Sequence, residues 1–103
     1  MFARVTRFET EPDQLDAATK LIKETMAPEA KRLQGFKGGY WLIDRMTSNG
    51  FSMTLYESEA ALHATEDDAA QLRSRASSVA RITEVERYEV IAEARVEELT
   101  PAR

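Results

Sequence analysis

The stretch that decides the fold is residues 35–57, GFKGGYWLIDRMTSNGFSMTLYE. Residues 40–43 form an apolar run without polar alternation, and a second largely apolar run covers residues 51–56. Uninterrupted apolar runs bounded by glycines and a turn are typical of strands covered on both faces. Asn49-Gly50 is the strongest turn signal, because both residues tolerate a positive φ. The stretch therefore predicts a β-hairpin with both faces buried.

The flanking sequence predicts a strand, a helix, a second helix and a strand. Residues 2–9 and 83–92 have apolar residues at both odd and even positions, as strands with two buried faces do. Thr10 and Pro12 begin a helix that runs to about Gln34, with Gly35 as the residue after its end. Ser58 is a good cap for the second helix.

Both helices contain a predicted irregularity. Pro28 should kink the first helix or split it after Met26, because its ring blocks the carbonyl four residues back. The acidic run 66–68 marks a break in the second helix, with a new helix from Asp68 and with Arg73, Arg75 and Arg81 toward its negative end. The apolar stripe of this helix consists mostly of small residues, which lie close to a sheet or leave space beside it.

The order of elements, βαββαβ, predicts an α+β, ferredoxin-like fold with a four-stranded antiparallel sheet. Two helices cover one face of such a sheet, yet the strands are apolar on both. A second copy packed face to face through a two-fold axis would bury the other face, so we expect a homodimer. The alternative is a monomer with scattered surface aromatics.

Composition restricts the class of protein. The chain has 103 residues, enough for one domain, and a formal net charge of −4, which argues against nucleic acid and anionic membranes as partners. It has no cysteine, which excludes disulfides. The first residues lack the apolar core of a signal peptide, and no stretch approaches the roughly 20 apolar residues of a membrane span. We therefore expect a soluble, cytoplasmic protein with one domain, residues 1–94, and a polar tail, residues 95–103.

Several landmarks resemble those of the antibiotic biosynthesis monooxygenase-like (ABM) domain, a dimeric α+β barrel. They are the helix interrupted by Pro28, the sequence LQGF at 33–36, Asp44-Arg45 before the turn, and LYESEA at 55–60, where many members have Trp-Glu-Ser. The resemblance covers residues 1 to about 94. It implies a cofactor-free oxygenase of aromatic polyketides or quinols, a haem-degrading enzyme, or a protein without known activity.

The haem-degrading branch matches least. It uses an Asn on the first strand, a Trp at the end of the third and a His on the second helix. This chain has no Asn in residues 2–9, Tyr56 in place of the Trp, and Glu66 at the spacing of the His. We therefore expect no haem and no other cofactor.

The best candidates for a binding site lie on the hairpin. If the odd positions of residues 51–56 fill the dimer interior, then Ser52, Thr54 and Tyr56 face the helices. A polar row opposite small residues predicts a cavity for a small ligand; the alternative is that these hydroxyls are satisfied locally and the space is filled. Trp41 and Tyr88 could line the same cavity and stack on an aromatic ligand, although such aromatics are more often core.

His63 is the only histidine, on the second helix beside the apolar stripe. One interpretation is a catalytic base at the rim of the cavity, with Tyr56 as its partner in catalysis; the more common role of such a residue is a surface or boundary histidine. It has no companion for a metal site. The acidic run 66–68 points in different directions on a helix, so we expect no metal there either.

Two functional classes follow. The first is a cofactor-independent monooxygenase of an electron-rich aromatic such as a hydroquinone or anthrone, which once deprotonated can itself reduce oxygen. The second is a non-catalytic homodimer that holds a small apolar ligand or serves a structural role. The absence of a convergent acid–base pair keeps the second class open.

Overall fold

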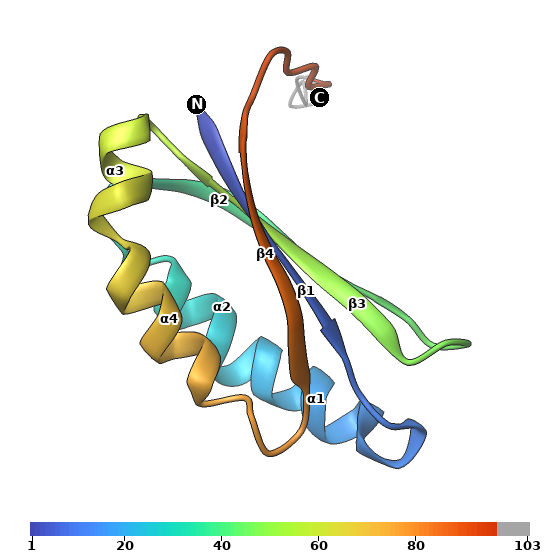
Figure 1. Ribbon diagram of the computed structural model, residues 1–103. Coiled ribbons are helices and arrows are strands. Elements are labelled where there is room, and N and C mark those ends of the chain that lie inside the picture. Colours follow the sequence, from blue (N-terminus) through green and yellow to red (C-terminus); the bar gives the residue numbers. More distant parts are fainter. Residues whose placement is uncertain (97–103) are drawn as a thin grey trace, which may run out of the picture.

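The computed structural model describes residues 1–96 and shows a four-stranded antiparallel sheet with helices on one face (Figure 1). The strand order is β2-β3-β1-β4, so the first strand lies inside the sheet. This is the predicted βαββαβ, ferredoxin-like fold. The strands are β1 (Phe2–Glu9), β2 (Phe36–Asp44), β3 (Asn49–Tyr56) and β4 (Arg81–Glu89).

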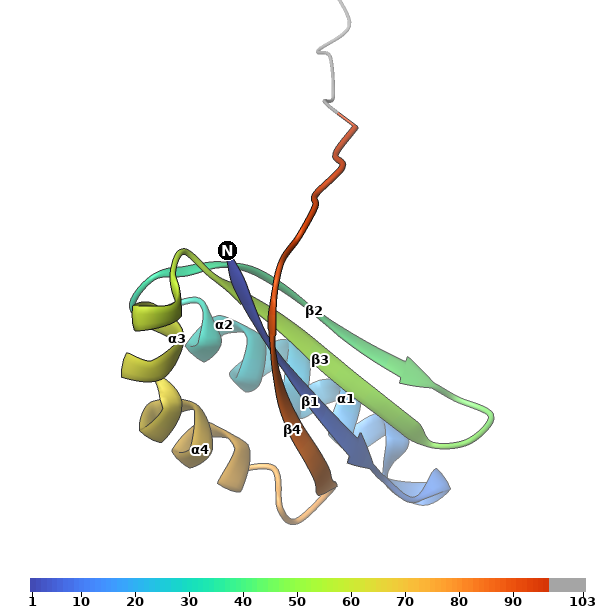
Figure 2. The same ribbon diagram turned by 45° about the horizontal axis from the view of Figure 1, so that its top comes forward.

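The helices form a second layer, with the sheet's other face left open (Figure 2). The first helical segment comprises η1 (Pro12–Gln14), α1 (Leu15–Leu21), η2 (Ile22–Met26) and α2 (Ala27–Ala30). The second comprises α3 (Glu59–Ala64) and α4 (Glu66–Ser74). None of the helices within residues 1–96 is long and apolar enough to cross a membrane.

Pro28 splits the first helical segment where the sequence predicts. The turn before it, η2, is π-helical, and a new α-helix begins at Ala27. Proline has no N–H to donate, and a π-turn is a common way to accommodate the disturbed hydrogen bonds. The backbone keeps helical angles at Met26 (φ −65°, ψ −49°) and Ala27 (φ −66°, ψ −46°), so the hydrogen-bond pattern changes while the chain stays helical.

The hairpin turn lies earlier in the sequence than the predicted turn at Asn49-Gly50. Asn49 already pairs with Asp44 in the ladder, so the turn is residues 45–48 and its positive φ falls on Ser48 (66°). The backbone N–H of Ser48 donates to the carbonyl of Asp44 at 2.8 Å. Gly50 is needed for close approach: a Cβ there would lie 2.6 Å from the Phe8 ring. The prediction that Asn49-Gly50 forms the turn is therefore wrong.

Ser58 caps α3 as predicted, its hydroxyl accepting from the N–H of Ala61 at 3.0 Å. The break in this segment falls at Thr65, so α4 begins at Glu66 and not at Asp68. Arg81 belongs to β4, which corrects its predicted place near the helix end.

The last strand also differs from its predicted limits, 83–92. It begins at Arg81 and ends at Glu89. Beyond it, the backbone N–H of Val90 donates to the carbonyl of Met1 at 2.9 Å, and the chain then runs away from the two layers (Figure 2). Ile91 and Val96 are 93% and 98% exposed. Most of the predicted polar tail, residues 97–103, lies outside the described residues.

Candidate functional site

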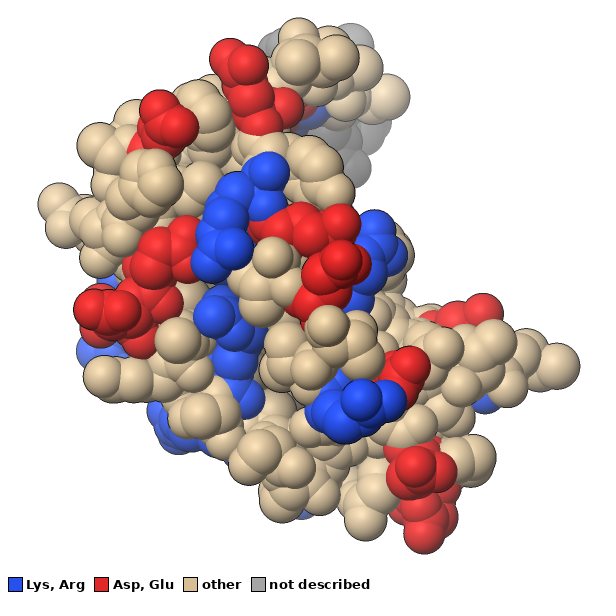
Figure 3. Space-filling view, in the orientation of Figure 1, with Lys and Arg blue, Asp and Glu red and all other residues tan. Residues whose placement is uncertain are grey.

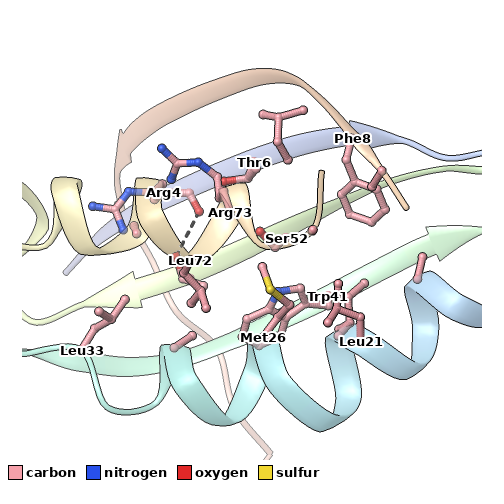
Figure 4. A pocket seen from close by; sticks show the side chains of 18 of the residues that line it. Arg4, Thr6, Phe8, Leu21, Met26, Leu33, Trp41, Ser52, Leu72 and Arg73 are labelled. Atoms are coloured by element: carbon pink, nitrogen blue, oxygen red, sulfur yellow. Dashed lines mark hydrogen bonds between the residues drawn. The ribbon is translucent and has the colours of Figure 1, made fainter. Parts of the chain in front are cut away.

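A cavity lies between the covered face of the sheet and the helical layer (Figure 4). About 70 Å³ of it is open to the centre of a water molecule, several times the roughly 10–15 Å³ that one water needs. The helices supply a mainly apolar wall, and the end near Phe8 is apolar as well. The larger apolar side chains of the wall are Leu21, Ile22, Met26, Leu33 and Leu72.

The floor of the cavity is the polar row of β3. Ser52, Thr54 and Tyr56 all line it and are 9%, 7% and 1% exposed. The strand parity therefore gives the correct face for these three residues. Trp41 of β2 lines the same cavity and pairs with Ser52 across the ladder. Two small residues line the cavity as well, Ala69 of α4 and Ala76 in the turn after that helix.

Arg4 is the residue that the sequence analysis missed. It lies on β1, lines the cavity and is 2% exposed. Its Nη1 donates to the hydroxyl of Tyr56 at 2.7 Å, and its Nη2 donates to the carbonyl of Leu62 at 2.8 Å and to the hydroxyl of Thr65 at 3.2 Å. The guanidinium lies 4.9 Å from the centre of the Tyr56 ring. A buried charge is costly unless it is paired. These hydrogen bonds therefore stabilise a charged guanidinium that an ordinary apolar core would exclude.

A second arginine, Arg73 of α4, lines the cavity near Arg4 (Figure 4). Within residues 1–96, its buried Nη1 has no hydrogen-bond partner, and neither has the Nε of Arg4. Burial lowers the pKa of Arg73, and the positive charge of Arg4 lowers that pKa further. Two cations with unused donors therefore adjoin one mainly apolar space.

Glu66 compensates part of this charge from outside the cavity. It accepts two hydrogen bonds from Arg87, at 2.7 and 2.9 Å, and its carboxylate lies 3.4 Å from the Nη2 of Arg4. The hydrogen bonds from Arg87 and the charge of Arg4 lower the pKa of Glu66 to about 2. Figure 3 shows basic side chains gathered along the seam between α4 and β4. Glu66 thus forms ion pairs with two arginines, Arg4 and Arg87, and none joins it to Arg73 within residues 1–96.

The structure does not bring His63 to the cavity. Its side chain is 67% exposed on α3, and its Nε2 lies 3.9 Å from the carboxylate of Glu59. It is absent from the residues that line the cavity. The interpretation of His63 as a base beside Tyr56 is therefore corrected to a surface histidine.

Tyr88 is not part of the cavity either. It pairs with Ala3 on the open side of the sheet and is 49% exposed. Its hydroxyl donates to a carboxylate oxygen of Glu86 at 2.8 Å, and this contact raises the pKa of Tyr88. The prediction that Tyr88 shares a site with Trp41 is corrected, because the sheet separates the two.

The chemistry of the cavity follows from its ionisable residues. Those that line it are Arg4, Arg73 and Tyr56. Within residues 1–96 no group of three or more His, Asp or Glu side chains could hold a metal ion. An arginine stays protonated and a tyrosine hydroxyl can donate, so the arrangement stabilises negative charge and does not supply a strong base.

The fold occurs in several solved structures. HapK from Hahella chejuensis matches with a TM-score of 0.77 over 95% of this chain and 100% of its own, at 14% identity. The NE2512 protein of unknown function from Nitrosomonas europaea matches with a TM-score of 0.72 over 94% and 95%, at 20% identity. A protein named antibiotic biosynthesis monooxygenase matches with a TM-score of 0.67 over 89% and 100%, at 14% identity.

This chain has the ABM-like fold. No protein-family model matches its sequence, and no curated protein matches it. At the identities above, the likeness to ABM-like structures concerns the arrangement of the backbone. The roles of Trp41, Tyr56 and the two cavity arginines therefore have to be argued from their own contacts.

Proposed function

We propose that the protein is a cofactor-independent monooxygenase that acts on a small aromatic, quinol- or anthrone-like substrate. The observation that carries this proposal is the cavity, in which Trp41 and Tyr56 accompany the cationic Arg4 and Arg73. The aromatic groups suit a flat ring, and the cations suit an oxygen that gains charge. Structures with the same fold include a protein named antibiotic biosynthesis monooxygenase.

The reaction needs little from the protein. An anthrone loses a proton to give an electron-rich enolate, which reduces O₂ directly. One oxygen atom becomes the new carbonyl and the other leaves as water, so the substrate supplies all the electrons. The protein has to exclude bulk water, hold the ring and stabilise the oxyanion.

Tyr56 is the residue proposed to touch the substrate oxygen. Its hydroxyl accepts a hydrogen bond from Arg4, which leaves its own proton free for donation into the cavity. Ser52 and Thr54 line the same floor and are proposed to orient the ring, with Trp41 stacked on it. Because no imidazole or carboxylate is among the residues that line the cavity, the phenol or enol is proposed to lose its proton to water before it enters, and the arginines favour the ionised form in the cavity.

We also propose that the protein is a homodimer, with two open sheet faces packed together. Tyr40 and Leu42 of β2 are 65% and 44% exposed on that face. On β3 the odd positions Phe51, Met53 and Leu55 are half-buried there. A contiguous apolar face of this kind is typical of an interface, and a second copy presents a complementary surface through a two-fold axis.

The alternative function is a non-catalytic homodimer that binds a small ligand. The observation in its favour is that the cavity contains no acid–base pair, so the same residues could hold an aromatic molecule without turnover. Binding alone would still use Trp41, Tyr56 and the arginines.

Oxygen uptake by the metal-free protein distinguishes the two functions. The panel consists of hydroquinones and anthrones, each measured against its spontaneous oxidation. Tyr56→Phe removes the proposed donor, and Tyr40→Phe makes the same change on the open face as a matched control. Uptake above the spontaneous rate that Tyr56→Phe reduces and Tyr40→Phe keeps supports the oxygenase. Binding without uptake across the panel would favour the non-catalytic protein.

A further inference from the structure

Two of the arginines that line the cavity each have a buried guanidinium nitrogen with no hydrogen-bond partner in the described part of the chain. These nitrogens are the Nε of Arg4 on β1 and the Nη1 of Arg73 on α4. Buried polar groups nearly always find a hydrogen-bond partner, so each exception needs an explanation. The Arg4 side chain is 2% exposed and is fixed by hydrogen bonds to Tyr56, Leu62 and Thr65. Its Nε is therefore a buried donor on a side chain that is held in place beside the cavity.

We infer that the cavity selects an organic anion, with an apolar body and its charge on a carboxylate, phenolate or enolate oxygen that accepts hydrogen bonds from Arg73 and Arg4. This inference names the ligand class of the proposed function and rests on the same cavity being the ligand site.

Electrostatics favour an anion over a neutral ligand. Arg4 and Arg73 carry charges of the same sign beside one mainly apolar space, and Glu66, which neutralises one of them, does not line it. A single negative oxygen between the two cations would relieve their repulsion and use both donors. Charge-assisted hydrogen bonds of this kind are about twice as strong as neutral ones. A neutral acceptor oxygen still receives hydrogen bonds from the charged guanidinium groups but gains no attraction between opposite charges.

The apolar wall determines the chemical character of the uncharged part of the ligand. Leu21, Met26 and Leu72 face the cavity together with the ring of Trp41 (Figure 4). Such a wall gives a small inorganic ion no partners, whereas a compact hydrophobic ring buries its surface there. The ligand class is therefore a small aromatic acid or an acidic phenol.

An adjoining surface groove supports an anionic ligand independently. It lies at the β2 edge and is lined by the three lysines Lys23, Lys31 and Lys37. Trp41 lines both this groove and the cavity, so its ring forms a shared wall. A cleft lined by one sign of charge raises the local concentration of the opposite ion and speeds its association. The groove would thus collect anions beside the cavity.

4-Nitrophenol tests the inference, because its ionised form has its own visible absorption band. Spectra are recorded across a pH series with the wild-type protein, with Arg73→Gln and with Arg75→Gln. Arg75 follows α4 with an exposed side chain and serves as the matched control. The groups around the ligand are Arg4 on β1, Arg73 on α4 and Tyr56 on β3, with Glu66 and Arg87 behind them.

We expect bound 4-nitrophenol to ionise at a lower pH than the free compound in the wild type and in Arg75→Gln. Arg73→Gln should bind the ionised form at least tenfold more weakly and abolish the shift. Equal binding of neutral and ionised forms, equal behaviour of Arg73→Gln and wild type, or no binding in the wild type would overturn the inference. Arg73→Lys keeps the charge and should recover part of the shift, which a merely structural role would not require.

Benzoate and benzamide, compared by calorimetry, form a second test with ligands of equal size. We expect benzoate to bind at least tenfold more tightly, and equal affinity for the two would contradict the inference. Their relative strength against 4-nitrophenolate distinguishes a carboxylate site from a phenolate site. These assays need no oxygen, so anion binding without turnover would reject only the oxygenase. Turnover of substrates without any preference for the anion would reject only this inference.

Discussion

The two faces of the sheet invert the usual arrangement of a small protein. The face covered by helices carries Arg4, Thr54 and Tyr56 around a cavity, whereas the uncovered face carries the apolar Tyr40 and Leu42. A covered face normally holds the apolar core, and polar groups normally face water. This difference underlies our two proposals, a ligand on the inner face and a second copy of the chain on the outer face.

Two arginines of the same strand, β1, allow a direct comparison of the two faces of the sheet. Arg4 lies on the covered face, and Arg7 lies on the open face, with its Nε donating to Glu86 at 2.8 Å. We expect Arg4→Met to lower the free energy of unfolding by about 3 kcal/mol, because it leaves a buried network without its donor. Arg7→Met should have a much smaller effect, since its ion pair is exposed to solvent. Chemical denaturation measures both, and equal losses would show that the Arg4 network is not special.

The open face is tested by a charge placed on its apolar surface. Leu42→Asp should weaken the dimer at least tenfold, because the new carboxylate would be buried without a partner. Gln71→Asp, on the exposed side of α4, should leave the dimer unchanged. Light scattering at micromolar concentration gives the mass. A wild-type mass equal to one chain would reject the proposed dimer.

The covered face is tested by removing Arg73, the cavity cation whose charge is less compensated. We expect Arg73→Met to raise the free energy of unfolding by about 1 kcal/mol, since it removes a buried unsatisfied donor and the repulsion from Arg4. This corresponds to a melting temperature higher by about 4–8 °C in a domain of this size. Arg75→Met should change it little. A lower melting temperature for Arg73→Met would indicate that Arg73 stabilises the fold and is not reserved for a ligand.

The smallest expected effect is the loss of folding stability when Glu66 is protonated at acid pH. Its pKa is about 2 in the folded protein, against an ordinary value of 4.5. The unfolded chain therefore takes up the proton first, so the stabilisation is complete above about pH 4.5 and is lost as the pH falls toward 2. Because Glu66 is partly exposed, we expect less than about 1 kcal/mol. Thermal unfolding of Glu66→Gln between pH 2 and 7 should lack this dependence, and an unchanged slope would contradict the assignment.

The fold was largely predictable because local signals agree with the overall arrangement. The first strand has its predicted limits, Ser58 caps α3, and Pro28 divides the first helical segment. The hairpin turn was mispredicted because Gly50 has two uses. A tight turn and a close approach to the Phe8 ring both require glycine, and only tertiary structure tells which applies.

The site was predictable in part. Alternation along β3 places Ser52, Thr54 and Tyr56 on one face, and the structure agrees. The same rule applied to β1 puts Arg4 beside Thr6 on that face, a signal that sequence reasoning could have used. The place of Arg73 in the cavity lining depends on how α4 packs in the folded chain, which the sequence does not reveal. His63 lies next to the buried Leu62 along the chain but points to solvent, because neighbouring helical residues face different directions.

Both proposed functions require that the cavity under the helices is the ligand site. Trp41 is the only tryptophan and lines both that cavity and the lysine groove, so its emission responds to a ligand in either place and a cavity variant distinguishes them. The measurement is a benzoate titration of the wild type and of Ala69→Val, which adds two carbons to the cavity wall; circular dichroism of the variant serves as the control for folding. We expect a saturable change in emission for the wild type and at least tenfold weaker binding for Ala69→Val. An absent change in the wild type, or the same affinity in both proteins, would contradict it.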